Sequence, residues 1–215
     1  MSAPLESEVY GAPTRSVAIH HVRAALRGAR RHGVDIAPLL EVASTPPELL
    51  DVPLARVSPQ QFARLTQAVW QALDDELQGL GPHPLKVGTF AMMCHAVVHC
   101  SPDLRTAINR SSTFYGLFPS GPRFQLDQRA GELGPQVAAL VFDLSGFDDL
   151  DHYLAESATV VAHRFAGRLI RRRIALTRVE FSHPAPPHAL QVLMESPFEV
   201  PAEPWRELAP ALTGG

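Results

Sequence analysis

The sequence has few cysteines, no long apolar run and no excess of positive charge, and each shortage excludes a class of protein. Two cysteines in 215 residues are too few for a disulfide framework, so reduced thiols are expected. No apolar run approaches the length of a membrane-spanning helix, and the opening "MSAPLESEVYGAPTRS" lacks the basic and apolar regions of a secretory signal. A net charge of −3 provides no broad basic field for phosphates. We therefore expect a soluble, cytoplasmic chain that does not contact DNA or membranes by itself.

Sequence signatures of catalysis are also missing. There is no P-loop, no dinucleotide-binding fingerprint and no paired-carboxylate motif. The stretch "SHPAPPH", from Ser182 to His188, combines a serine with two histidines but has no nucleophile elbow, and its prolines fix a turn. The acidic "DLSGFDDLD" lacks the ligand spacing of a calcium loop. We predict neither an enzyme nor a bound cofactor.

The chain is nevertheless rich enough in apolar residues, at 46%, to bury a substantial core. Its first half predicts helices. One is expected from Val17 to Arg31 and a short one over "IAPLLEVA". Another begins at Ser58 in "SPQQFARLTQAVWQALDDELQGL", where Ser58 and Gln61 match a capping box. "KVGTFAMMCHAVVHC" is apolar nearly all round and predicts a buried central helix, and a further helix should end near Phe118.

The second half changes to a strand pattern. "RFQLDQRA" and "QVAALVFDL" predict a hairpin, a long helix follows from about Asp149 to Arg173, and "ALTRVEFSHP" alternates as a third strand. "APPHALQVLM" suggests a short helix and "SPFEV" an edge strand. The predicted fold class is α+β, with a helical N-terminal half packed on a small antiparallel or mixed sheet with one long helix. We expect a flexible tail over 1–16, a single domain over 17–200 and a second tail over 201–215.

Four stretches, in their order and spacing, carry a family resemblance. They are "LRGARRHGVDIAPLLEVA", "LLDVPLARVSPQQFARLTQAVWQAL", "VGTFAMMCHAVVHCSPDLRTAINRSSTFYGLF" and "VEFSHPAPPHALQVLM". Over about residues 18–200 the chain resembles the N-terminal ligand-binding, arabinose-binding-like domain of AraC/XylS-type transcriptional regulators. The resemblance implies a bacterial transcription regulator whose domain senses a small-molecule effector and forms a homodimer.

Members of that family carry a C-terminal DNA-binding region with two helix-turn-helix motifs. After residue 200 this sequence ends in "WRELAPALTGG", without such a pair or a basic recognition helix. Contact with DNA is therefore expected only through a missing C-terminal domain. We favour an excised or truncated sensor domain over a natural protein without a DNA reader. A regulator that acts by forming heterodimers with a full-length relative is a further alternative.

The stretch "MMCHAVVHC" raises the question of a metal site. His95 and His99 are four residues apart, so a helix would place both imidazoles on one face. Cys94 and Cys100 would point elsewhere and would not complete a metal site. The remaining ligands would have to come from distant histidines, such as His83, His152, His163 or His188. The family pattern has no such histidine pair, so the resemblance gives no support for a shared metal site here. A stand-alone metal- or haem-binding protein that uses His95 and His99 is the alternative hypothesis.

The stretch is interpreted as a buried helix rather than a metal site. Its histidines either bond to the backbone within the core or, together with the next helix, contact an effector. The candidate ligand-binding residues are Met92, Met93, His95, His99, Tyr115 and Phe118. Thioethers adapt to irregular shapes, and imidazoles bond to polar groups, so the expected effector is small and apolar or amphipathic. Effector binding would favour one of two domain arrangements and so change the dimer or the attached DNA reader. The helix from Asp149 to Arg173 is the expected dimer surface.

Overall fold

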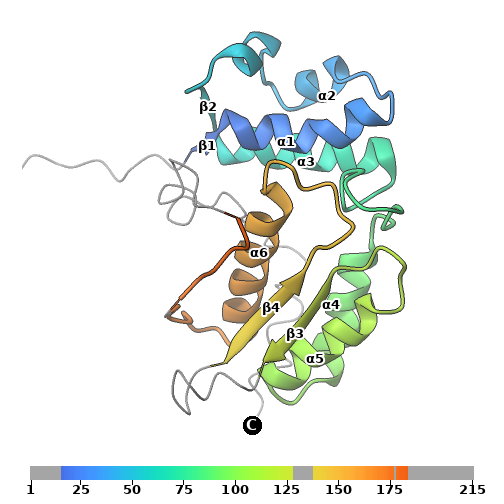
Figure 1. Cartoon of the computed structure of the whole chain (residues 1–215), viewed down its shortest axis with the longest axis vertical. Helices are drawn as coiled ribbons and strands as arrows, with labels where there is room; N and C mark the ends of the chain where they lie inside the picture. The colour runs from blue at the N-terminus through green and yellow to red at the C-terminus, as the bar shows by residue number, and fades with distance from the viewer. Residues whose placement is uncertain (1–15, 128–137, 177, 184–215) are drawn as a thin grey trace, which may run out of the picture.

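The computed structural model describes residues 16–127, 138–176 and 178–183 (Figure 1). Helices dominate the described part of the chain. Its elements, in chain order, are β1 (Val17–Ala18), α1 (Ile19–Arg31), α2 (Ala37–Val42), the 3-10 helix η1 (Pro47–Asp51), β2 (Arg56–Val57), α3 (Pro59–Leu73), α4 (Thr89–Cys100), α5 (Leu104–Tyr115), β3 (Arg123–Asp127), β4 (Ala139–Asp143) and α6 (Tyr153–Leu169). The predicted α+β class is confirmed.

The strands form two separate antiparallel pairs. β3 pairs with β4, and the aromatic rings of Phe124 and Phe142, which are register partners, have centroids 5.6 Å apart. This is the predicted hairpin. β1 pairs with β2, so Val17 and Ala18 lie in a two-residue strand and the first helix begins only at Ile19.

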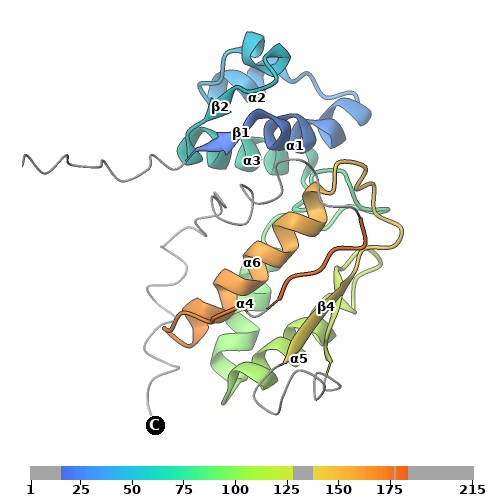
Figure 2. The same cartoon turned by 60° about the vertical axis from the view of Figure 1, so that its left-hand side comes forward.

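Two apolar clusters make up the core. The first joins α1, α2, η1 and α3 around the fully buried Leu26 and Leu65. The second joins α4, α5 and the hairpin around Met93 and Val97. α6 belongs to both clusters, because Tyr153 at its start packs in the first and Phe165 near its end packs in the second. Figures 1 and 2 accordingly show α6 running from α1 down beside α4.

Local sequence signals explain where the helices start. The Ser58 hydroxyl accepts a hydrogen bond from the Gln61 backbone N–H at 3.2 Å, and the Gln61 side chain accepts one from the Ser58 N–H at 2.8 Å. The predicted capping box of α3 is thus confirmed. Asp103 caps α5 in the simpler way, accepting from the Thr106 N–H at 2.7 Å.

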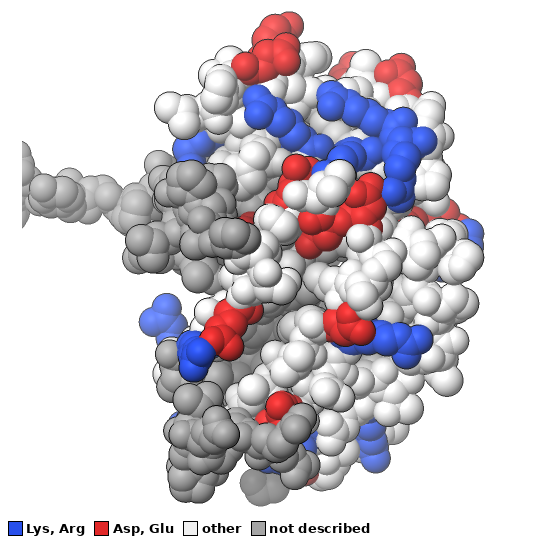
Figure 3. Space-filling model, viewed as in Figure 1, with Lys and Arg blue, Asp and Glu red and all other residues white. Residues whose placement is uncertain are grey.

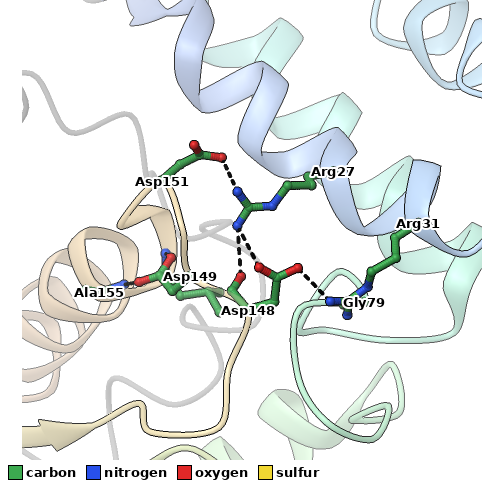
Figure 4. A network of polar contacts seen from close by, with 8 residues as sticks. Arg27, Arg31, Gly79, Asp148, Asp149, Asp151 and Ala155 are labelled. Atoms are coloured by element: carbon green, nitrogen blue, oxygen red, sulfur yellow. Dashed lines mark hydrogen bonds and ion pairs between the residues drawn. The ribbon is translucent and has the colours of Figure 1, made fainter.

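Polar contacts fix α1 to the loop that precedes α6 (Figure 4). Arg27 donates to Asp151 at 2.6 Å and to both the carbonyl and the carboxylate of Asp148, at 3.0 and 3.2 Å. Arg31 donates to the other oxygen of the Asp148 carboxylate at 2.6 Å and also to the carbonyl of Gly79. On the face shown in Figure 3, basic side chains accordingly border a group of acidic ones. The charged network joins two segments that are far apart in the sequence.

Two expectations about the second half need correction. The long helix begins at Tyr153 rather than Asp149, because His152 adopts a left-handed conformation with φ 58° and the Asp149 carboxylate accepts the N–H groups of Leu154 and Ala155. It ends at Leu169 rather than Arg173. Residues 174–176 and 178–183 form no strand, although the exposure of 178–183 alternates as a strand would require. The predicted helix "APPHALQVLM" and edge strand "SPFEV" lie outside the described residues.

The central helix was also expected to be buried on all sides, and this is wrong for α4. Met93, Cys94 and Val97 are buried, whereas the Met92 side chain is 63% exposed and His95 is exposed as well. Sequence composition does not distinguish a helix covered on one face from one covered on all faces when the outward residues are apolar. Within the described residues, no helix combines the length and apolar character that crossing a membrane requires.

Candidate functional site

The predicted site residues separate into an inner and an outer group. Met93, which is 2% exposed, and Tyr115 lie in the second apolar cluster, and Phe118 packs against that cluster. Phe114 connects the last two, because its ring centroid lies 5.6 Å from that of Tyr115 and 5.3 Å from that of Phe118. Ser111 donates a hydrogen bond to the Met93 sulfur at 3.2 Å. Three of the predicted residues therefore lie together.

The outer group faces away from this cluster. Met92 and His95 are exposed on the opposite side of α4. Of His99 the structure describes only the backbone, as part of α4. A guest molecule held in the second cluster would thus contact Met93 but not its neighbour Met92, without a rearrangement of the helix.

A half-buried carboxylate that the sequence interpretation missed lies at the start of α4. The two oxygens of Glu76 accept hydrogen bonds from the backbone N–H groups of Gly88 and Phe90, at 2.8 and 2.9 Å. Burial raises the pKa of Glu76, and these two bonds partly oppose the rise. The sequence pattern places "LDDELQGL" at the end of a helix, so nothing in the pattern marks Glu76 as part of a site.

The charge of Glu76 acts on two groups of the second cluster. Burial raises the pKa of Cys94 to about 12, and the negative charge of Glu76 adds to this effect. The pKa of Tyr115 is raised for the same two reasons, burial first. Cys94 and Tyr115 are therefore neutral near pH 7. The inner group consequently consists of apolar and neutral polar side chains near the half-buried Glu76, a combination that suits an apolar guest with one polar group.

The loop between α3 and α4 is organised by a second acid. Asp75 is 2% exposed, and its carboxylate accepts the backbone N–H groups of Leu77, Gly79 and Leu85 at 2.9, 2.8 and 2.7 Å. Next to it, Gln78 exchanges hydrogen bonds with the Tyr153 hydroxyl. The loop that positions Glu76 is thereby fixed to the start of α6.

A comparison with protein-family models settles the family. The model for the arabinose-binding domain of AraC transcription regulators, N-terminal, matches residues 33–204. The chain belongs to this family. Comparisons with curated proteins and with solved structures found no match. The resemblance inferred from the four sequence stretches is confirmed, and the chain has the ligand-sensing type of domain of AraC regulators.

A group of possible metal ligands in this AraC-type domain lies away from "MMCHAVVHC". One nitrogen each of His20 and His21, on α1, and a carboxylate oxygen of Glu156, on α6, all lie within 4.8 Å of one another. Burial raises the pKa of Glu156, and the charge of the nearby His183 partly opposes this rise. The His183 ring stacks on that of His152 at 3.6 Å. The sequence offered no signal for the group, because its members come from helices far apart in the chain.

Proposed function

We propose that this chain is the effector-sensing and dimerisation domain of an AraC-type bacterial transcription regulator and acts in the cytoplasm. The observation that carries the proposal is the family match over residues 33–204. The effector is a small apolar or amphipathic molecule, and its site includes Met93, Tyr115 and Phe118. DNA is contacted through a DNA-binding domain of the kind that AraC regulators carry at the C-terminus.

The chemistry of the second cluster supports this class of effector. Aromatic rings border the inner residues, with Phe90 against Phe165 at 5.9 Å and Tyr115 against Phe124 at 6.2 Å between ring centroids. Aromatic faces and a methionine thioether provide adaptable apolar contact. The Glu76 carboxylate is the nearby charged group, and it would favour an effector that carries a hydrogen-bond donor or a cationic group over one that carries a carboxylate.

The outer face of α4 supports a dimer surface on this helix. Met92, Ala96 and Cys100 recur at a spacing of four residues, and all three are exposed. In a twofold dimer the same patch of each subunit meets its copy, so an exposed apolar stripe suits self-association. We therefore place the dimer contact on α4 rather than on the long helix expected from the sequence, and assign Met92 and His95 to it.

The mechanism follows from the position of these two surfaces on one helix. An effector that binds the inner face of α4 more tightly in one arrangement shifts the population toward that arrangement. The outer face then presents a different dimer contact, which the attached DNA reader senses. By linkage, DNA binding must change the affinity for the effector by the same factor.

Neighbouring methionines provide a matched test of this proposal. Native mass spectrometry of the full chain, purified from a bacterial host, is expected to show a dimer and a co-purifying small molecule. Met93→Leu, which nearly conserves volume, should weaken binding of that molecule and leave the dimer intact. Met92→Ala should weaken the dimer and leave the small-molecule affinity unchanged. A monomer without any bound molecule, or equal effects of both substitutions, would contradict the proposed function.

A further inference from the structure

α1 and α6 meet where the first apolar cluster ends, and this junction holds two histidines and a glutamate. Figures 1 and 2 both show the start of α6 directly beneath α1. His21 and Glu156 are each only 8% exposed, so both lie inside the junction. The His21 ring packs against those of Tyr153 and Phe62, with centroid distances of 6.1 and 6.4 Å. A nitrogen-rich, largely water-excluded group of potential ligands therefore connects two helices.

The two histidines converge despite being sequence neighbours. Consecutive residues on a helix point about 100° apart and do not normally face each other. His20 and His21 occupy the first turn of α1, and their ring centroids are nevertheless only 4.1 Å apart. Each ring offers one nitrogen toward the same point as the Glu156 carboxylate. Three potential ligand atoms from two helices therefore lie close together.

We propose that His20, His21 and Glu156 form a binding site for a divalent transition-metal ion of the zinc class, which fastens the start of α1 to α6. Two imidazoles with one carboxylate form a ligand set that zinc uses while keeping a further position open. Imidazole nitrogen also suits other first-row ions, whereas Mg²⁺ and Ca²⁺ require oxygen ligands. Through Glu156 the metal would be bound to α6, the helix that packs in both apolar clusters.

The separations permit binding after a small adjustment. Two ligand atoms each about 2.1 Å from a zinc ion are at most about 4.2 Å apart. The three atoms here lie within 4.8 Å of one another, so small rotations of the side chains bring them to coordinating distance. This inference concerns the junction of α1 and α6 and does not depend on an effector site in the second cluster.

The test uses the full chain without a histidine tag, because a tag would itself bind zinc. After treatment with a chelator, isothermal titration with Zn²⁺ is expected to show about one ion per chain and a higher midpoint of thermal unfolding, whereas Mg²⁺ has no effect. His20→Ala, His21→Ala and Glu156→Gln should each weaken Zn²⁺ binding at least roughly tenfold. His83→Ala removes an exposed histidine outside the group and is the matched control, with unchanged affinity.

A second measurement does not depend on whether the variants fold. Co²⁺ added to the unmodified chain should give the visible spectrum of nitrogen and oxygen ligation, without the strong near-ultraviolet bands that thiolates add. Four results would overturn the proposal: no Zn²⁺ binding by the unmodified chain, equal binding by all folded variants, loss of binding in His83→Ala alone, or a thiolate spectrum with Co²⁺.

Discussion

Replacement of Gly28 by alanine tests how closely α1 approaches the loop that follows α3. A Cβ atom at Gly28 would lie 1.7 Å from the carbonyl oxygen of Gln78 and 2.8 Å from its carbonyl carbon. Carbon and oxygen atoms normally approach no closer than about 3.3 Å. The loop would therefore have to move away from α1 by about 1.5 Å, because the helix backbone has little freedom to shift in a packed core.

Two opposing effects decide the sign of the change in stability. Alanine is the better helix former, which favours the folded state by about 0.5–1 kcal/mol. Overpacking costs about 1–3 kcal/mol, and moving the loop also strains the hydrogen bonds of the buried Asp75 carboxylate, each worth about 1.5–3 kcal/mol. The bonds between Gln78 and Tyr153 would be strained as well. The clash prevails, with an expected net loss of about 2–5 kcal/mol.

Urea unfolding followed by far-ultraviolet circular dichroism measures this loss. Gly167→Ala is the matched control, because it makes the same substitution in a helix, where the new Cβ would lie 3.1 Å from the Arg172 carbonyl oxygen. We expect the control to remain within about 1 kcal/mol of the unmodified chain. If Gly28→Ala proved as stable as the control, the close approach of α1 to this loop would be wrong.

Three further predictions concern the polar groups of the fold. In the native state at pH 8, only the exposed Cys100 should react with a thiol reagent. Cys94 is kept neutral by a pKa of about 12 and should react only in denaturant. Two reactive thiols in the native state would contradict the burial of Cys94. Arg27→Ala should lower the free energy of unfolding by about 1–3 kcal/mol, less at high salt, because Asp148 loses a half-buried partner; a loss independent of salt would exclude an ionic origin. Burial raises the pKa of Glu76, so the folded state binds a proton at this carboxylate more tightly than the unfolded state does. The free energy of unfolding should therefore fall as pH rises from about 4.5 through the folded pKa. Glu76→Gln should abolish that part of the decline, as measured by urea unfolding over the same pH range.

Much of the fold is predictable from local signals. The start of α3 follows from Ser58 and Gln61, whose side chains satisfy backbone N–H groups that the helix leaves unpaired. The hairpin of β3 and β4 follows from an alternating run and a continuous apolar run that lie close together in the sequence. In both cases the determining residues are neighbours in the chain, so the sequence contains the whole cause.

The unpredicted features depend on contacts between distant segments. Met92 and Met93 are chemically identical neighbours, and only the packing of α5 and α6 against α4 decides which of them is buried. The side chains of residues 178–183 do alternate in exposure. A strand also requires a second strand to pair with, and the sequence does not reveal whether one is present. The convergence of His20 with Glu156 likewise requires the fold to bring α1 against α6.

α6 is the element through which the two ends of the domain must influence each other. Tyr153 at its start is held in the first cluster by Gln78, while Phe165 near its end packs on Phe90 at the start of α4. A change of packing on the inner face of α4 would therefore reach α1 either as a displacement of α6 or through the loop that carries Glu76 and Asp75. The loop is held by at least five hydrogen bonds that backbone N–H groups donate to the carboxylates of Asp75 and Glu76. A displacement of α6 relative to α1 would strain the contacts of Arg27 and Arg31 with Asp148. An ion held between α1 and α6 would oppose that movement. Metal and effector would then lower each other's affinity through the position of α6, although they bind at separate sites.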